Sequence, residues 1–497
     1  GAAPLSVLPD ADTLSAREGG RPMAPETGIS NARYPDDFET FWRKSVQEGG
    51  LTLPGSPARF ADVFRRPGDS TALGLPTPPA PGLKLHVHPS LAFYDGRSAN
   101  RSWLQEMPDP MTRAVWDSWV ELHPETARAL GVQTGDRVRL TTAAGSCETA
   151  AFVWDGVAKE TAALATGQGH TAGGRTARGV GVNAFALLSA PETTPDAKPS
   201  LPVKIEKVAG AGELVRAHGE QRQHGREIVQ TIALSSLAIA RPDKVHLPLP
   251  QGYEHEHDVY KGHDHPAHRW AMAVDLDRCN GCNACVVACY AENNIPVVGK
   301  KEVGRRHEQP WIRIDRYDEG EGAQTRSAFQ PMLCQHCDSA PCETVCPAYA
   351  TVHSPEGLNE QVYNRCVGTR YCANNCPYKA RRFNWFNPEW PEPLPLQLNP
   401  DVTVRSRGVM EKCTFCVQRI KEVTIRAKAE ARPVKDGEIT PACAQTCPAE
   451  AIVFGDLMDH GSRIARIVAE DPRRYQVLRE LNTKPAVFYR KRIVDGD

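Results

Sequence analysis

The alternation of apolar and polar residues predicts a sheet-rich segment over residues 82–205. In LKLHVH, residues 83–88, every second position is apolar, which is typical of a half-buried strand before a turn. The stretch from His123 to Gly156 then reads as a short helix, a glycine turn and two strands joined by AAGS. This order of elements predicts a compact β-rich domain.

The rest of the chain has weaker periodicity and divides mainly by composition. We expect an N-terminal arm at 1–81, a charged linker at 206–270, a cysteine region at 271–460, and a C-terminal helix and tail at 461–497. The arm holds one helical pattern, DDFETFWRKSVQEGG, and the tail is expected to start as a helix at Asp471 and to end it at Pro485.

No run of 18 or more apolar residues marks a membrane-spanning helix. The strongest candidate, IVQTIALSSLAIA at 228–240, is short and carries hydroxyl groups, so we expect a buried or partner-facing segment. The chain begins at Gly1, which indicates either a removed leader or part of a longer polypeptide.

Composition adds two constraints. The 497 residues carry a formal net charge of −1, so no strong field favours nucleic acid or an anionic membrane surface. Sixteen cysteines are present, and all except Cys147 lie between Cys279 and Cys447. Their tight C-x₂-C spacing favours metal binding over a disulfide framework, whereas the isolated Cys147 is expected to be a plain buried thiol.

The fifteen clustered cysteines form four runs. These are Cys279, Cys282, Cys285 and Cys289; Cys334, Cys337, Cys342 and Cys346; Cys366, Cys372 and Cys376; and Cys413, Cys416, Cys443 and Cys447. In the C-x₂-C-x₂-C-x₃-C-P pattern, the first three cysteines hold one iron–sulfur cluster and the fourth ligates another. Four runs of this kind therefore predict four clusters.

The third run, CVGTRYCANNCP, has Thr369 where the second cysteine would stand. Four cubane clusters need one thiolate more than the fifteen available, and a hydroxyl is a poor ligand for cluster iron. We therefore predict three [4Fe–4S] clusters and one [3Fe–4S] cluster, the latter of raised potential. Two alternatives are zinc in the C-x₂-C pairs and a cubane completed by water or hydroxyl at Thr369.

The order of the four runs resembles the four-cluster ferredoxin subunits of polysulfide, dimethyl sulfoxide and nitrate reductases and formate dehydrogenases. The resemblance implies that runs one and four share two clusters and that runs two and three share the others. Carried over by position, it implies [4Fe–4S] ligands Cys279, Cys282, Cys285 and Cys447; Cys289, Cys413, Cys416 and Cys443; and Cys334, Cys337, Cys342 and Cys376. The [3Fe–4S] ligands would be Cys346, Cys366 and Cys372.

The sheet-rich segment resembles the cofactor-capping domain of molybdopterin oxidoreductases, a double-psi β-barrel. The resemblance rests on residues 121–157 and on the glycine-rich stretch GQGHTAGGRTARGVGVN at 167–183. The implied fold is a molybdopterin-dinucleotide-binding-like barrel followed by a four-cluster ferredoxin-like domain. Because the chain shows no upstream molybdenum domains, no molybdopterin is expected and the glycine-rich stretch is interpreted as vestigial.

A barrel of this type fused to four cysteine runs is similar to the iron–sulfur subunit of alternative complex III. WAMAVDLDRCNGCNACVVACYAENNIPVVGK and LNTKPAVFY also carry the resemblance. It implies electron transfer from quinol, with an integral-membrane quinol-binding subunit and multihaem or monohaem cytochrome c subunits as partners. It also implies a peripheral position on the periplasmic side of the bacterial inner membrane, and no bond-making site in this chain.

Two other functions remain open. One is an electron-transfer subunit of an active molybdenum oxidoreductase acting on sulfur compounds or formate. The other is a structural scaffold whose clusters conduct nothing.

Two further motifs carry separate expectations. His255, His257, His263, His265 and His268 fall close together, which permits metal or haem ligation but favours a solvated or partner-covering loop. RRFNWFN at 381–387 directly follows the third run and is expected either to dock a partner or to pack at the edge of the core.

Overall fold

The computed structural model describes most of the chain beyond the N-terminal arm. The described residues are 82–189, 200–219, 222–242, 263–319 and 326–495, and they belong to one compact unit. The helix expected near residue 40 lies outside them, as do His255 and His257. Within these ranges, none of the helices combines the length and apolarity required to cross a bilayer.

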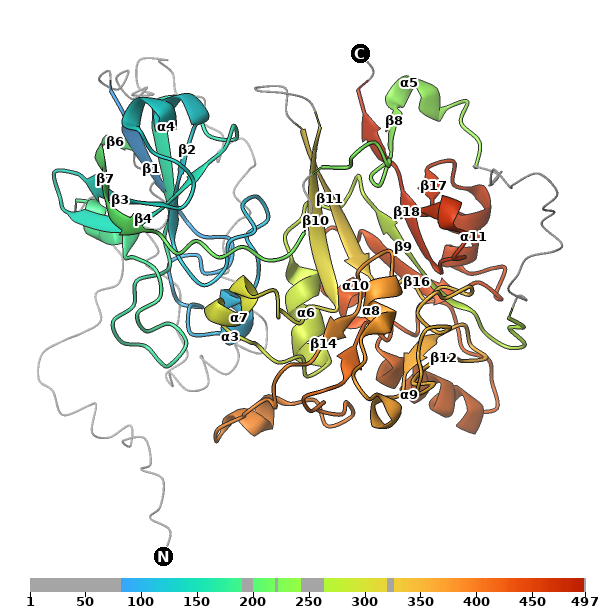
Figure 1. Cartoon of the computed structure of the whole chain (residues 1–497). Coiled ribbons are helices and arrows are strands. Elements are labelled where there is room, and N and C mark those ends of the chain that lie inside the picture. The colour runs from blue at the N-terminus through green and yellow to red at the C-terminus, as the bar shows by residue number, and fades with distance from the viewer. Residues whose placement is uncertain (1–81, 190–199, 220–221, 243–262, 320–325, 496–497) are drawn as a thin grey trace, which may run out of the picture. The chain divides into compact units, whose positions relative to one another are not determined.

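Within the described residues, seven strands form one mixed sheet in the order β6-β1-β5-β2-β4-β3-β7 (Figure 1). The strands are β1 (Lys84–His88), β2 (Trp119–Leu122), β3 (Asp136–Thr141), β4 (Ser146–Val153), β5 (Thr161–Ala165), β6 (Ser200–Pro202) and β7 (Lys204–Ala211). β1 pairs in parallel with β5 and β2 with β4, while the other neighbours are antiparallel. The sheet continues to Ala211, past the expected boundary at 205.

The local elements expected around His123 are confirmed. Helix α4 (Pro124–Leu130) begins after His123, whose ring accepts a hydrogen bond from the Glu125 N–H. It ends at Gly131, where φ is +64°, a left-handed conformation that favours glycine. β3 and β4 follow as the two expected strands. Val138 and Leu140 of β3 and Ala151 of β4 contribute to a core that also includes Leu85 and Val120.

The cysteine region is built around a second sheet with the order β16-β9-β18-β17 within the described ranges. Its strands are β9 (Trp270–Asp275), β16 (Ile452–Asp456), β17 (Arg474–Tyr475) and β18 (Val487–Arg490). β18 runs parallel to β9, and β16 pairs antiparallel on the other side. The carboxylate of Asp275 at the end of β9 accepts hydrogen bonds from Arg473 and Arg490.

Short hairpins and helices support the cysteine loops. The paired strands are β10 (Ile312–Glu319) with β11 (Arg326–Leu333), β12 (Thr351–His353) with β13 (Asn359–Gln361), β14 (Arg382–Phe383) with β15 (Met410–Glu411), and β8 (Thr231–Ala233) with β19 (Arg492–Val494). The helices are α5 (Leu234–Leu237), α6 (Ala284–Glu292), α7 (Lys300–Gly304), α8 (Tyr371–Asn375), α9 (Val417–Ala429), α10 (Ala442–Gln445) and α11 (Arg463–Glu470). One further helix, α3 (Ser102–Gln105), lies earlier in the chain, before the glycine-rich stretch. The hairpin β10–β11 lies beside α6 (Figure 1).

The structure corrects the expectation for the tail. The helix there is α11, which ends at Glu470, and the residues after it form β17 and β18 instead of a helix starting at Asp471. Asp471 precedes Pro472 and has an extended conformation, with φ −74° and ψ 116°, as expected for a residue before proline. The tail is therefore part of the second sheet.

The apolar stretch at 228–240 is not a buried element. Val229 is buried, but Leu234 and Ile239 are 57% and 78% exposed. The stretch forms β8 and the short helix α5, and the predicted partner-facing role stays a prediction.

Candidate functional site

The four cysteine runs share a backbone turn. In each, the residue before the second ligand position has a positive φ: 74° at Gly281, 44° at His336, 76° at Gly368 and 56° at Phe415. This turn brings the first two positions of a run to the same side of the loop. The third run adopts it with Thr369 at the second position, so a hydroxyl stands where the other runs present a thiol.

The folded chain gathers the fifteen cysteines into four groups, which we name by their first member. They are the Cys279 group with Cys282, Cys285 and Cys447; the Cys289 group with Cys413, Cys416 and Cys443; the Cys334 group with Cys337, Cys342 and Cys376; and the Cys346 group with Cys366 and Cys372. Each is assembled from at least two runs, in the combinations implied by the family resemblance. The first three contain four thiols, and the last contains three.

Burial makes these groups unfavourable places for free thiolates. It raises the pKa of Cys285, Cys289 and Cys337, and negative charge on neighbouring thiols raises each further. All sixteen cysteines are free of disulfides. A cation that binds several thiolates at once removes both penalties, so the donor set fits an iron–sulfur cluster.

Backbone N–H groups already point at several sulfurs. After Cys346 and Cys447 the sequence continues Pro-Ala-x-Ala, and the N–H of the last alanine donates to the cysteine Sγ at 3.2 Å and 3.3 Å respectively. The Met410 N–H donates to Cys366 Sγ at 3.4 Å in the same way. Such bonds stabilise negative charge on sulfur and help to set the potential of a cluster.

The four groups follow one another in a series. Cys285 of the Cys279 group interacts electrostatically with Cys443 of the Cys289 group. Cys413 of the Cys289 group interacts in turn with Cys334. Arg381 interacts with members of both the Cys334 group and the Cys346 group. The Cys346 group therefore stands at the end of the series.

Arg381 is the residue that links the last two groups. It is 6% exposed, and its Nη2 donates to Cys342 Sγ at 3.2 Å and to Asn359 Oδ1 at 2.7 Å. Its Nη1 donates to Gln361 Oε1 at 2.7 Å. The charge of the guanidinium is therefore held against sulfur by fixed neighbours.

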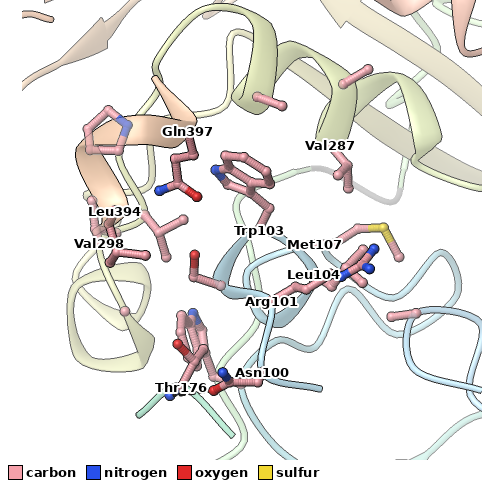
Figure 2. A pocket seen from close by; sticks show the side chains of 18 of the residues that line it. Asn100, Arg101, Trp103, Leu104, Met107, Thr176, Val287, Val298, Leu394 and Gln397 are labelled. Atoms are coloured by element: carbon pink, nitrogen blue, oxygen red, sulfur yellow. Dashed lines mark hydrogen bonds between the residues drawn. The ribbon is translucent and has the colours of Figure 1, made fainter. Parts of the chain in front are cut away.

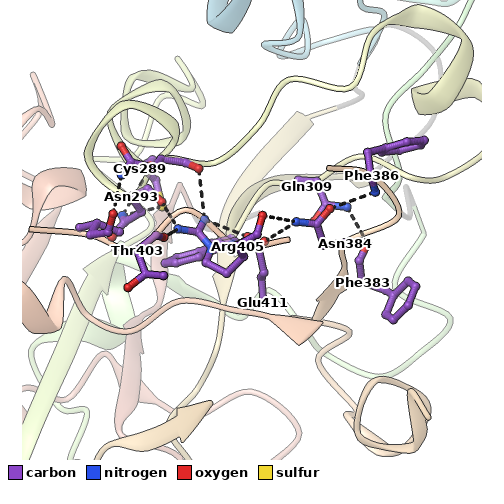
Figure 3. Close-up of polar contacts among 12 residues, drawn as sticks. Cys289, Asn293, Gln309, Phe383, Asn384, Phe386, Thr403, Arg405 and Glu411 are labelled. Atoms are coloured by element: carbon purple, nitrogen blue, oxygen red, sulfur yellow. Dashed lines mark hydrogen bonds and ion pairs between the residues drawn. The ribbon is translucent and has the colours of Figure 1, made fainter. Parts of the chain in front are cut away.

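A second buried guanidinium supports the Cys289 group (Figure 3). Arg405 pairs with Glu411 at 2.9 Å, and both side chains are at most 1% exposed. Arg405 Nη1 also donates to the Asn293 carbonyl at 2.8 Å. The Asn293 side chain in turn donates to Cys289 Sγ at 3.5 Å, so the ion pair is connected to the cysteine loop through one residue.

A buried carboxylate joins the sheet-rich part to the cysteine region. Glu106 accepts hydrogen bonds from the N–H groups of Val298 and Gly299, from Trp116 Nε1 and from the Tyr290 hydroxyl. Burial raises the pKa of Glu106 to about 7 despite these four donors. Tyr290 directly follows Cys289, so this contact fixes the end of α6.

A cavity of 1270 Å³ lies beside the Cys279 group (Figure 2). Its lining includes Cys282, the α6 residue Val287, Arg101 and Trp103. Arg178 of the glycine-rich stretch also lines it. The glycine-rich stretch therefore faces a space that reaches the first cysteine group.

The remaining sequence motifs have mixed outcomes. RRFNWFN packs locally, because Trp385 stacks on His307 at 4.5 Å and Arg370 lies over the Trp385 ring. Cys147 is half-buried instead of fully buried, and burial raises the pKa of its thiol to about 11. The His265 side chain is not solvated, since it is 8% exposed, whereas the His268 side chain is 28% exposed and bonds to Asp456. The predicted partner-covering role stays a prediction.

Sequence reasoning missed Arg381, Arg405 and Glu106. Arg381 belongs to the aromatic segment RRFNWFN, and its place soon after a Cys-Pro pair is a usable signal. The other two had no local signal, because their partners lie far away in the sequence.

Models of known protein families match the sheet-rich part and the cysteine region of this chain separately. A family model described as a molydopterin dinucleotide binding domain matches residues 91–199. Two models described as 4Fe-4S dicluster domains match residues 278–350 and 325–391. The predicted fold class, a molybdopterin-dinucleotide-binding-type domain followed by a 4Fe-4S ferredoxin-like domain, is confirmed.

Relatives of known role match slightly less than half of the chain, and three of them illustrate the range of identity. The iron–sulfur cluster-binding subunit of menaquinone reductase from Nitratidesulfovibrio vulgaris is 40% identical, over 45% of this chain and 89% of that protein. Iron–sulfur subunit 1 of the Hdr-like menaquinol oxidoreductase from Archaeoglobus fulgidus is 39% identical, over 45% and 83%. The electron transfer subunit of thiosulfate reductase from Salmonella typhi is 30% identical, over 42% and 85%.

Proposed function

Because the chain belongs to the family of iron–sulfur electron-transfer subunits of oxidoreductase complexes, we propose that it carries electrons from quinol in a membrane subunit toward a cytochrome c partner. The assembly would be of the alternative complex III type. This chain would sit peripherally on the periplasmic side of the membrane, and it would itself make or break no substrate bond.

The ligands of this proposal are the four cysteine groups. The Cys279, Cys289 and Cys334 groups each offer four thiols for a [4Fe–4S] cluster, and the Cys346 group offers three for a [3Fe–4S] cluster. When bound, the clusters supply single-electron transfer from one group to the next. The observation that carries the proposal is the series of four groups linked through Cys285–Cys443, Cys334–Cys413 and Arg381.

Thr369 supports a three-iron centre at one end of that series. Gly368, the residue before Thr369, has a positive φ like the corresponding residues of the other three runs. The Thr369 side chain is nevertheless exposed and offers only a hydroxyl. A missing iron corner raises the potential of a cluster, which suits an acceptor placed next to a quinol site. We therefore assign the Cys346 group to the quinol-facing end.

The test is paramagnetic resonance of the purified, oxidised complex with wild-type chain and with Thr369→Cys. A three-iron centre gives a signal when oxidised, whereas cubanes are silent in that state. We expect the signal in the wild type and its loss in Thr369→Cys, with a gain of one iron per chain and slower reduction by quinol. Thr369→Ser is the matched control and should retain the signal.

A wild-type complex that lacks the signal and contains a full fourth cubane would overturn the three-iron assignment. Clusters that quinol cannot reduce in the intact complex would overturn the conducting role and favour a structural scaffold.

One observation favours a second function, an electron-transfer subunit of an active molybdenum enzyme. The cavity beside the Cys279 group is lined by Arg101, Arg175 and Arg178, and its wall includes the glycine-rich stretch. Guanidinium groups and backbone N–H groups of this kind suit phosphate-bearing cofactors. Molybdenum in stoichiometric amount in the isolated complex would favour this function over the first.

A further inference from the structure

Three side chains outside the cysteine groups converge on one point. His265 comes from the segment before β9, Asp338 from the loop of the Cys334 group, and His353 from the end of β12. His265 Nε2 lies 3.2 Å from Asp338 Oδ1, and His353 Nε2 lies 3.3 Å from the same oxygen. One potential ligand atom from each residue lies within 4.8 Å of the others.

The converging atoms are buried and lack hydrogen bonds. The three side chains are 8%, 9% and 4% exposed, in the order His265, Asp338 and His353. Among the described residues, neither ring nitrogen of His265 has a hydrogen-bond partner, nor has Asp338 Oδ1 or His353 Nε2. A buried polar atom without a partner costs about 1–3 kcal/mol. Three of these four atoms, His265 Nε2, Asp338 Oδ1 and His353 Nε2, face one another, which indicates an occupant.

The spacing suits a tetrahedral metal ion. Histidine nitrogen and carboxylate oxygen bind Zn²⁺ at about 2.0–2.1 Å, which places neighbouring tetrahedral ligands about 3.3–3.4 Å apart. The two measured separations from Asp338 Oδ1 agree with that edge length. The same separations lie at the long end of the range for direct N–H···O hydrogen bonds.

Surrounding residues bind the atoms of His353 and Asp338 that point away from the converging ligand atoms. Glu343 Oε1 lies 3.4 Å from His353 Nδ1, which leaves His353 Nε2 directed at Asp338. Glu343 is itself held by Asn359 Nδ2 at 2.5 Å. Arg269 Nη2 contacts Asp338 Oδ2 at 2.5 Å, which leaves Oδ1 available. Carboxylate–histidine pairs of this kind orient metal-binding imidazoles.

We propose that His265, Asp338 and His353 bind one divalent transition-metal ion of the zinc class. The ion would connect the segment before β9 to the loop of the Cys334 group and to β12. Its ligands include no cysteine, although Asp338 directly follows Cys337, and the proposal does not depend on the proposed function. A second set, His263, Glu343 and His353, shares one histidine with it but includes the exposed His263.

A proton is the competing occupant. Burial alone lowers the pKa of His353, but Asp338 and Glu343 raise it to about 9. A protonated His353 would then pair with both carboxylates and leave His265 without a role.

The experiment is metal analysis of the full chain, purified in its complex with its clusters, after incubation with ZnCl₂ and removal of free metal. We expect one zinc per chain in the wild type and an at least tenfold loss in His265→Gln and in His353→Gln. Iron and sulfide contents should stay unchanged, which shows that these variants fold. The matched control is His268→Gln, from the same histidine run, whose wild-type ring instead bonds to Asp456.

Zinc-edge X-ray absorption identifies the ligands. Nitrogen and oxygen neighbours at about 2.0–2.1 Å support the site, whereas sulfur at about 2.3 Å would mean zinc in a cysteine group and would overturn it. Absence of zinc from the wild type would overturn the site in favour of the proton. Loss of zinc in His263→Gln with retention in His265→Gln would overturn the assigned ligand set.

Discussion

Replacing Arg381 with methionine should lower the reduction potentials of the centres in the Cys334 and Cys346 groups. The guanidinium is buried, contacts Cys342 Sγ at 3.2 Å and interacts with Cys372. Reduction adds negative charge to a cluster, so a fixed positive charge favours the reduced state. Methionine has similar length and removes that charge.

The size of the shift follows from Coulomb's law. At about 6 Å from a cluster centre and an effective dielectric constant of about 20, one charge contributes about 3 kcal/mol. For a one-electron couple this energy corresponds to a change on the order of 100 mV. Loss of the guanidinium also leaves Asn359 Oδ1 without a strong donor, which costs about 1–3 kcal/mol of folding stability. Gln361 Oε1 keeps its hydrogen bond from Thr351 Oγ1.

The assay is a redox titration of the intact complex followed by paramagnetic resonance. Arg381→Lys keeps the charge and should shift the potentials much less than Arg381→Met. Arg365→Met removes an exposed charge near Cys366, where solvent screening should leave only a small effect. Unchanged potentials in Arg381→Met, with all clusters present, would refute the electrostatic argument.

Three other substitutions test the supporting structure. The pKa of Glu106 is about 7 in the folded protein, against 4.5 for an ordinary glutamate carboxyl. Its contribution to the free energy of unfolding is therefore complete below about pH 4.5 and falls by about 3 kcal/mol as the pH rises through 7. Glu106→Gln should flatten this slope in thermal unfolding, and an unaltered pH profile would contradict it. Arg405→Met leaves Glu411 as an unpaired buried charge, so denaturant unfolding should show a loss of about 3–5 kcal/mol, with partial recovery in the double variant with Glu411→Gln. Gly281→Ala places a methyl group 2.5 Å from the Phe329 ring at a φ of 74°, so iron analysis should show loss of the cluster at the Cys279 group, whereas Gly437→Ala, an open positive-φ position, should retain it.

Patterns within a short stretch of sequence predicted their structures well. The helix, glycine turn and two strands after His123 depend on contacts between near neighbours, and the structure has all of them. The turns within the cysteine runs are equally local. The combination of runs into groups came from family resemblance, since spacing alone does not say which runs meet.

Contacts between distant segments could not be read from the sequence. Glu106 meets Val298 and Tyr290 across nearly two hundred residues, and nothing around Glu106 marks it as buried. The tail reads as helical because its apolar residues suit a helix, but Pro472 and the pairing with β9 override that preference. His265 appeared to be one of many solvated histidines until the fold placed it against Asp338.

The position of β18 has a consequence for biosynthesis. This strand enters the sheet between β9 and β17, and its Arg490 completes the bonds to Asp275, although some two hundred residues separate the two strands. The Cys279 N–H donates to the Asp275 carbonyl, so we expect the loop of Cys279 to reach its final position only after the chain has been synthesised through Arg490. A chain that ends before Val487 is expected to retain the first cluster less well.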